Sequence, residues 1–295
     1  MSNIRRQIAR VAANDANVLI TGESGTGKEL VAELIHENSR RRAAPFVAVN
    51  CAAIPDALLE SELFGYERGA FTGAATAREG KLQHANTGTL FLDEIGDMSL
   101  ASQAKILRVI ENRVIQRLGS NVDTVVSFRT VAATNQDLDG LVREKKFRKD
   151  LYFRLNVIRL HLPPLRERCE DIPELADLIV CESSQRQGQT MRRLESDVIR
   201  RLQGHSWPGN VRELRNVLES ILVYSDSRSI GLAEVPPNIR KTLFSRSPQP
   251  DERSRILTTL DSANWNRTKA AAMLGCSRMT LYRKMVKYSM TSGGV

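Results

Sequence analysis

The sequence of 295 residues contains no apolar run near the roughly 18 residues that a membrane span requires, so an integral membrane protein is excluded. Its N-terminus, MSNIRRQIAR, has neither an apolar core nor a small-residue cleavage site. We therefore expect no secretory signal and a cytoplasmic location. The four cysteines, Cys51, Cys169, Cys181 and Cys276, form no CxxC pair. No His lies near them at the spacing of a zinc site, so we expect reduced, mostly buried thiols without a metal or redox role.

Charge is unevenly distributed along the chain. The net charge of the chain is +9. Residues 253–290 hold eight basic residues and one acidic residue, so this segment supplies +7 of the net charge. The chain therefore has a nearly neutral body and a basic end, and such an end is typical of contact with nucleic acid.

Short apolar runs alternate with helical stretches in the body. The runs lie at residues 17–20, 46–50, 88–95, 126–134 and 157–162. This order predicts an α/β fold with a parallel, doubly wound sheet over residues 1–170. Beyond residue 168 we expect no strands: residues 171–240 predict a helical subdomain, residues 241–252 a linker and residues 253–295 a separate basic module.

A glycine-rich segment between the first strand and the first helix of the sheet matches a phosphate-binding P-loop. It consists of Gly22, Glu23, Ser24, Gly25, Thr26, Gly27 and Lys28. Backbone N–H groups and the helix N-terminus would face phosphate, and Lys28 would reach the β- and γ-phosphates. Glu29 occupies the position at which a P-loop usually has a Ser or Thr whose hydroxyl coordinates Mg²⁺. We therefore expect other residues to coordinate the metal.

Two carboxylates end the apolar run at residues 88–95. Asp93 suits Mg²⁺, and Glu94 suits a general base that polarises the attacking water. An apolar strand that ends in this pair, downstream of a P-loop, is the Walker B pattern.

Several motifs in order resemble the AAA+ ATPase of NtrC-family bacterial enhancer-binding proteins over about residues 1–240. They are GESGTGKE, ESELFGYERGAFTGA, GTLFLDEIGDM, FRKDLYFRLNV, LPPLRER and WPGNVRELRN. The resemblance implies an AAA+ P-loop NTPase with a helical lid subdomain, ATP and Mg²⁺ as cofactors, and self-association into a ring, as a hexamer. In that family a Glu after the P-loop Lys is usual, which matches Glu29.

The same resemblance implies roles for five further residues. Asn50 resembles the switch residue that holds the Walker B Glu94 until the γ-phosphate is sensed, and Asn135 resembles sensor I. Arg212 resembles the sensor II arginine that contacts nucleotide. Arg148 and Arg154 match two arginines that reach across a subunit interface to a neighbour's γ-phosphate, where a planar cation stabilises charge spread over phosphate oxygens.

A glycine-flanked segment interrupts an otherwise helical stretch and predicts a loop with an exposed apolar tip. It consists of Gly69, Ala70, Phe71, Thr72, Gly73 and Ala74. In the family that the chain resembles, this GAFTGA string engages sigma-54, so the resemblance implies the sigma-54 RNA polymerase holoenzyme as a partner.

The basic end predicts three short helices at residues 254–263, 267–274 and 277–288, with Asn266 and Ser277 as N-caps and Gly275 in a turn. The pattern resembles a Fis-type helix-turn-helix, a small all-α domain whose last helix recognises double-stranded DNA. The side chain of Tyr282 could lie in the core of the domain or contact the DNA. The candidate DNA contacts are Arg267, Lys269, Ser277, Arg278, Thr280, Arg283 and Lys284.

These features together predict an ATP-hydrolysing transcription activator that binds enhancer-like DNA and remodels sigma-54 RNA polymerase toward the open complex. One rival function is a DNA-binding regulator whose nucleotide only controls assembly, but Glu94, Asn135 and the two candidate trans arginines argue against it. A second rival is an AAA+ chaperone or unfoldase, which needs neither the GAFTGA string nor a helix-turn-helix. No regulatory region is recognisable upstream of the ATPase motifs in this sequence, so we expect that control comes from a separate protein or that the chain is a fragment.

Overall fold

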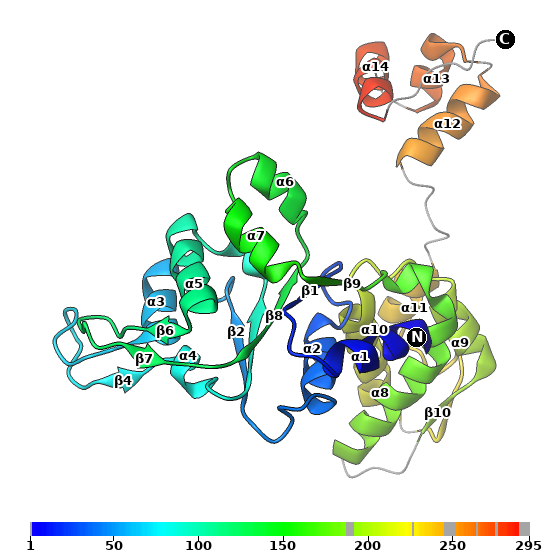
Figure 1. The fold of residues 1–295 in the computed structure, drawn as a ribbon. Coiled ribbons are helices and arrows are strands. Elements are labelled where there is room, and N and C mark those ends of the chain that lie inside the picture. Colours follow the sequence, from blue (N-terminus) through cyan, green and yellow to red (C-terminus); the bar gives the residue numbers. More distant parts are fainter. Residues whose placement is uncertain are drawn as a thin grey trace. The chain divides into compact units, whose positions relative to one another are not determined.

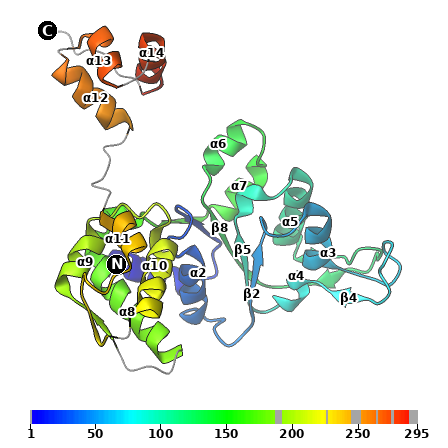
Figure 2. The same ribbon diagram turned by 180° about the vertical axis from the view of Figure 1, so that it is seen from behind.

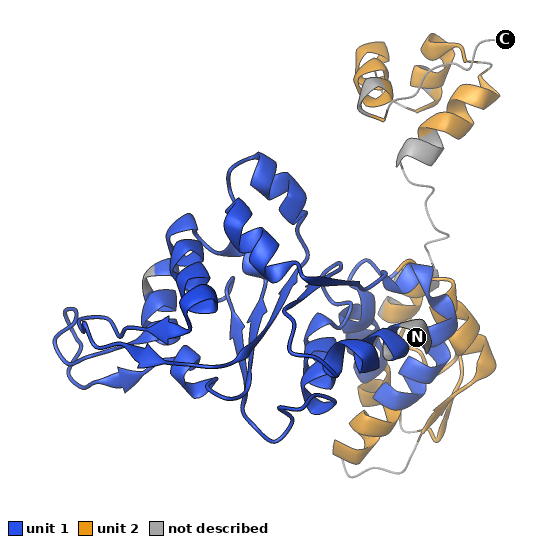
Figure 3. Ribbon diagram, in the orientation of Figure 1, with its two compact units in different colours: residues 1–179, 207–219 blue, residues 180–206, 220–295 orange. Residues whose placement is uncertain are grey.

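The computed structural model describes residues 2–186, 192–225, 227–244, 252–263, 265–274 and 277–288. It divides into two compact units (Figure 3). The first contains residues 1–179 and 207–219, and the second contains residues 180–206 and 220–295.

A five-stranded parallel sheet forms the centre of the first unit (Figure 1). Its spatial order is β2 (Phe46–Asn50), β5 (Thr89–Asp93), β8 (Arg129–Thr134), β1 (Val18–Thr21) and β9 (Ile158–His161). Every neighbouring pair is parallel. The predicted parallel sheet is therefore confirmed, with all five strands where the apolar runs lie.

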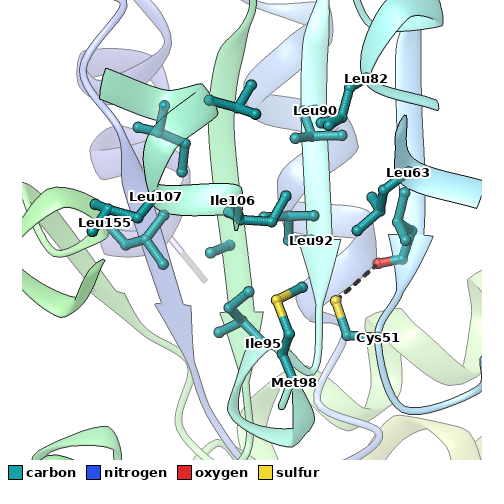
Figure 4. Packing of buried hydrophobic residues seen from close by; sticks show 14 of the residues in the cluster. Cys51, Leu63, Leu82, Leu90, Leu92, Ile95, Met98, Ile106, Leu107 and Leu155 are labelled. Carbon is teal, nitrogen blue, oxygen red and sulfur yellow. Dashed lines mark hydrogen bonds between the residues drawn. The ribbon is translucent and has the colours of Figure 1, made fainter. Parts of the chain in front are cut away.

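Alternate residues of these strands supply two separate cores, because successive side chains point to opposite faces of a sheet. Val18, Ile20 and Phe91 pack on one face with α1 (Ser2–Ala12) and α2 (Lys28–Glu37). Leu19, Leu90 and Leu92 pack on the other. That face is covered by α3 (Asp56–Phe64), α4 (Lys81–His84), α5 (Leu100–Asn112), α6 (Leu138–Arg143) and α7 (Lys149–Leu155) (Figures 2 and 4).

Two short hairpins extend from this second layer. β3 (Gly65–Tyr66) pairs with β4 (Arg78–Glu79), and β6 (Val114–Ile115) pairs with β7 (Thr124–Val125), both antiparallel. The GAFTGA string connects β3 and β4 and lies between α3 and α4, so it interrupts a helical stretch as predicted, but the two strands that flank it were not predicted. Strands of two residues carry too little periodicity to be recognised in the sequence.

The remaining turns and helices follow residue 161. Residues Leu165–Glu167 (η2) and Cys169–Asp171 (η3) form 3₁₀ turns, as Ile95–Asp97 (η1) does after β5. The helices are α8 (Ile172–Arg186), α9 (Ser196–Gln203), α10 (Asn210–Tyr224) and α11 (Pro237–Phe244). A parallel pair, β10 (Arg193–Leu194) and β11 (Ser229–Ile230), contradicts the prediction that strands stop at residue 168. The predicted linker is also helical at residues 241–244, while residues 245–251 lie outside the described residues.

The basic end forms α12 (Glu252–Ser262), α13 (Arg267–Met273) and α14 (Arg278–Lys287) around its own core, which includes Leu260, Ala270 and Leu281. The predicted three helices and both N-caps are confirmed. Asn266 accepts from the N–H groups of residues 268 and 269, and Ser277 from that of residue 280. Gly275 and residues 289–295 lie outside the described residues.

Across the described ranges, no helix is both long and apolar enough to cross a membrane. Cys51 is buried, whereas Cys169 and Cys181 are half-buried, so the expected burial holds only for the first; Cys276 is not among the described residues. Burial, reinforced by nearby carboxylates, raises the pKa of the Cys51 thiol to about 12, which keeps it protonated and unreactive.

Candidate functional site

Four strands of the sheet place polar residues at one edge, because parallel strands end on the same side. β1 leads into the P-loop and β5 ends in Asp93. β8 is followed by Asn135, and β2 ends in Asn50. The fold therefore brings the Walker A, Walker B and sensor candidates together from positions far apart in the sequence.

The P-loop backbone requires glycine at two positions. Gly25 has a φ of 78° and Gly27 a φ of 98°, both in the left-handed region that side chains disfavour. A Cβ at Gly25 would also lie 2.3 Å from the carbonyl oxygen of Gly209. No side chain caps the N-terminus of α2. Its first N–H groups and positive dipole end therefore suit an anion.

Lys28 and Glu94 meet inside a cleft of about 290 Å³ beside this loop. Lys28 Nζ lies 3.2 Å from Glu94 Oε1 and donates to the carbonyl of Gly22 at 3.1 Å. The other oxygen of Glu94 accepts from the backbone N–H of Asn135 at 3.0 Å. These contacts hold the carboxylate between the phosphate cradle and β8. Lining residues of the cleft are Ser24, Gly25, Gly27, Lys28, Glu29, Leu30, Asp93, Glu94, Val211, Arg212 and Arg215.

Asp93 fits a magnesium ligand. Burial, with a smaller effect of the Glu94 charge, holds the pKa of Asp93 above its ordinary value, so a nearby cation would relieve an electrostatic cost. Within the described ranges no three acidic, His or Cys side chains gather as a metal cage. Mg²⁺ is usually held by one or two carboxylates together with substrate phosphates and water, and a single carboxylate such as Asp93 fits that pattern.

Asn50 and Arg212 lie differently with respect to the cleft. Asn50 Oδ1 accepts from the backbone N–H groups of Ala52 and Ala53, and the Glu94 carboxylate is held by Lys28 and Asn135 instead. The switch role of Asn50 stays a prediction. Arg212 lines the cleft, and its guanidinium donates to the hydroxyl of Ser24 at 3.3 Å.

A set of polar contacts that the sequence analysis missed anchors the P-loop. Arg166 forms two hydrogen bonds with the Glu23 carboxylate, at 2.6 and 2.9 Å, and holds the pKa of that carboxyl below its ordinary value. The buried Asn210 donates to Glu23 and to the carbonyl of Ser24, while its own oxygen accepts from Leu165. Glu23 therefore acts as an anchor in this structure. Arg166 belongs to the LPPLRER motif and Asn210 to the WPGN motif, so these two motifs were the sequence signal for the contacts that anchor the P-loop.

The two candidate trans arginines lie on α7 and its N-terminal boundary. Arg148 is exposed and pairs with Asp150, 2.7 Å away, which raises the pKa of its guanidinium. Arg154 is also exposed, and its carbonyl accepts from Asn17. Among the described residues that line the cleft, neither arginine is present.

Phe71 lies at the tip of the loop between β3 and β4. Its ring is 43% exposed and packs edge-on against Tyr66, with ring centroids 5.0 Å apart. Arg117 of the second hairpin pairs with Glu67 and Glu79 at the base of the loop. The predicted exposed apolar tip is therefore present, and a neighbouring hairpin supports it.

The candidate DNA contacts surround α13 and α14. Six of them are exposed, and Lys284 is half-buried. Tyr282 is half-exposed and lies under the Arg267 guanidinium, which is 6.0 Å from the ring centroid. Of the two positions that the sequence left open for Tyr282, the structure therefore favours the surface.

Comparison with family models matches three regions of the chain. Residues 1–161 match the sigma-54 interaction domain, residues 166–252 match an AAA+ ATPase lid domain, and residues 250–288 match the bacterial regulatory proteins of the Fis family. The predicted AAA+ fold, lid and helix-turn-helix are thereby confirmed.

Curated relatives and solved structures agree with these matches. The chain is 44% identical to the regulatory protein AtoC of Escherichia coli, over 100% of this chain and 67% of that protein. It is 48% identical to the Nif-specific regulatory protein of Klebsiella pneumoniae, over 96% of this chain and 56% of that protein. The crystal structure of NtrX from Brucella abortus in complex with ADP has a TM-score of 0.75 and 33% identity, covering 98% of this chain and 68% of that one. The chain thus spans about half to two-thirds of the length of these relatives.

Proposed function

Because this chain belongs to the sigma-54 interaction domain family of AAA+ ATPases, we propose that it is an ATP-hydrolysing transcription activator. It binds enhancer-like double-stranded DNA and remodels the sigma-54 RNA polymerase holoenzyme from the closed to the open promoter complex, in the cytoplasm. This proposal rests on the observation that one chain combines three features: a phosphate-binding loop with Lys28 and Glu94 in contact, an exposed Phe71 loop, and a helix-turn-helix with a hydrophobic core of its own.

ATP binding uses the P-loop backbone, and Lys28 contacts the β- and γ-phosphates. Bound Mg²⁺, held by Asp93, would neutralise charge on those phosphate oxygens. Glu94 orients and deprotonates the attacking water, and Asn135 fixes the direction of its carboxylate by the backbone hydrogen bond. Arg212 reaches the same cleft from α10.

The arginines Arg148 and Arg154 act in trans, from a neighbouring copy in a ring that we propose is a hexamer. α2 exposes the acidic Glu29 and Glu37 beside the apolar Leu30 and Leu34. α7 and its boundary expose basic residues beside the apolar Phe153. The two faces are therefore complementary in charge and both partly apolar, which suits a head-to-tail contact that completes the active site.

The test is open-complex formation with purified sigma-54 holoenzyme on a sigma-54 promoter. We expect opening with ATP and none with a non-hydrolysable analogue. Opening that proceeds equally with the analogue would favour the rival in which nucleotide only controls assembly. ATP-dependent unfolding of unrelated proteins, with no promoter opening, would favour the unfoldase.

A further inference from the structure

Two apolar side chains face outward on the recognition helix α14. Leu281 and Met285 point into the core of the three-helix domain. Met279 and Tyr282, by contrast, are 64% and 50% exposed. With 3.6 residues per turn, positions 279 and 283 lie on one face of the helix, roughly opposite positions 281 and 285. An exposed methionine therefore lies one turn before an exposed arginine, Arg283.

The polar residues at the start of α14 are already engaged within the domain. The hydroxyls of Ser277 and Thr280 lie 2.8 Å apart, and Ser277 Oγ also accepts from the N–H of Thr280. The Tyr282 ring carries the Arg267 guanidinium. Met279 therefore presents the exposed apolar surface in the first turn of α14, and its unbranched thioether adapts to the shape of a partner.

The charge around this face selects the kind of partner. Residues 253–290 carry +7, and Arg278 and Arg283 flank Met279 on α14, so a polyanion is favoured. The major groove of DNA holds one apolar group that distinguishes the bases, the C5-methyl of thymine. The N-terminal part of a recognition helix is the part that contacts base edges.

We propose that Met279 packs against the C5-methyl of a thymine, and that Arg283 donates to the O6 and N7 of a nearby guanine. This inference rests on the proposed function of α14 as a recognition helix. One helical turn rises about 5.4 Å and one base pair about 3.4 Å, which puts the thymine about one or two base pairs from the guanine. Each helix-turn-helix that binds DNA thus specifies one thymine–guanine element.

The experiment replaces single chemical groups in the DNA. A duplex is first selected from a random-sequence pool with the full chain, and each thymine is then replaced by deoxyuridine, which lacks only the methyl group. For each helix-turn-helix that binds the duplex, we expect one position at which uracil weakens binding about four-fold, the effect of losing one buried methyl group. Met279→Ala should bind the two duplexes equally, and Met279→Leu should keep the preference for thymine.

A matched control comes from α13. Met273 is 57% exposed but lies outside the recognition helix, so Met273→Ala should discriminate thymine from uracil as the parent does. 7-Deazaguanine lacks the N7 acceptor to which Arg283 is proposed to donate. Replacing the nearby guanine by this analogue should weaken DNA binding by the parent and leave DNA binding by the Arg283→Ala variant unchanged.

Two results would overturn the inference. The parent could ignore uracil at every position, or Met279→Ala could keep the full discrimination between thymine and uracil. If Met279→Ala kept that discrimination and also lost self-association, Met279 would belong to a contact between copies of the chain instead. Failure to select any sequence from the pool would instead remove DNA binding from the proposed function, and the inference with it.

Discussion

Lys28 Nζ lies 3.2 Å from Glu94 Oε1, so the cation that contacts phosphate and the proposed general base form one ion pair inside the nucleotide cleft. Their side chains are 6% and 16% exposed. Because Lys28 also donates to the carbonyl of Gly22, both residues are held in place before substrate chemistry begins. A γ-phosphate would compete with Glu94 for the Lys28 charge and leave the carboxylate available to water.

Replacing Glu94 with Gln should slow ATP hydrolysis at least about 100-fold while leaving ATP binding intact, because the base is lost and the phosphate cradle stays. The variant also leaves Lys28 buried without its counter-ion, so ATP should raise the melting temperature more than it does in the parent. Steady-state turnover and thermal melting with ATP measure the two effects. Turnover close to that of the parent would contradict the role of Glu94.

The pair between Arg166 and Glu23 should add a pH-dependent contribution to stability. The pKa of Glu23 is lowered in the folded state, so the stabilisation is present above the ordinary Glu pKa and is lost as the pH falls through the folded value. Both side chains are partly exposed, so Glu23→Gln should cost about 1 kcal/mol or less near pH 7. A double-mutant cycle with Arg166→Met, run at pH 7 and pH 4, isolates the pair. A coupling energy that is unchanged at pH 4 would disprove this explanation.

Arg148→Ala and Arg154→Ala should each lower ATP turnover about 1,000-fold, because each removes a cation from a neighbour's γ-phosphate. Mixing either variant with Lys28→Ala should restore part of the activity through hybrid interfaces. Arg143→Ala, which removes an exposed arginine paired with Asp137, serves as the control and should keep normal turnover. If the mixtures stay inactive although the copies co-assemble, the arginines do not act in trans.

Phe71→Ala and Thr72→Ala should uncouple ATP hydrolysis from activation. The loop holds no phosphate ligand, so turnover should stay within about a few-fold of the parent. Losing a central anchor typically costs about 2 kcal/mol or more, which should abolish sigma-54 binding in the presence of a transition-state mimic of ATP. Tyr224→Ala removes another exposed aromatic ring and should change neither property. Parallel loss of ATPase and activation would place the loop in the catalytic fold instead.

Deleting residues 253–295 should abolish sequence-specific DNA binding and leave ATP turnover largely intact. These residues carry most of the net positive charge, and α12, α13 and α14 enclose a hydrophobic core of their own. Binding to a selected duplex, measured at several salt concentrations beside the ATPase rate, checks both statements. Specific binding by the shortened chain would locate the DNA contact elsewhere.

Local patterns determined much of this protein. Several features depend only on residues within one strand, turn or helix. They are the P-loop, the five apolar runs of the sheet, the strand end at Asp93 and Glu94, and the capped helices of the basic end. Their periodicity and turn chemistry can be read directly from neighbouring positions. The GAFTGA loop and the helix-turn-helix were recognised through their resemblance to a known family, which rests on continuous stretches of this sequence.

Only the tertiary structure decided which distant residues meet. Arg166 anchors Glu23 across 143 positions, Asn210 across 187, and Arg117 pairs with Glu67 across 50. Such pairs leave no trace in local periodicity, because each forms only after the chain has folded back on itself. The hairpins beside Phe71 consist of two-residue strands, whose pairing depends on the packed layer from which they extend. The tertiary structure also decided where Tyr282 lies. The sequence alone allowed its side chain to lie in the core or on the surface. Because Leu281 and Met285 fill the core of the domain, Tyr282 lies on the exposed face of α14.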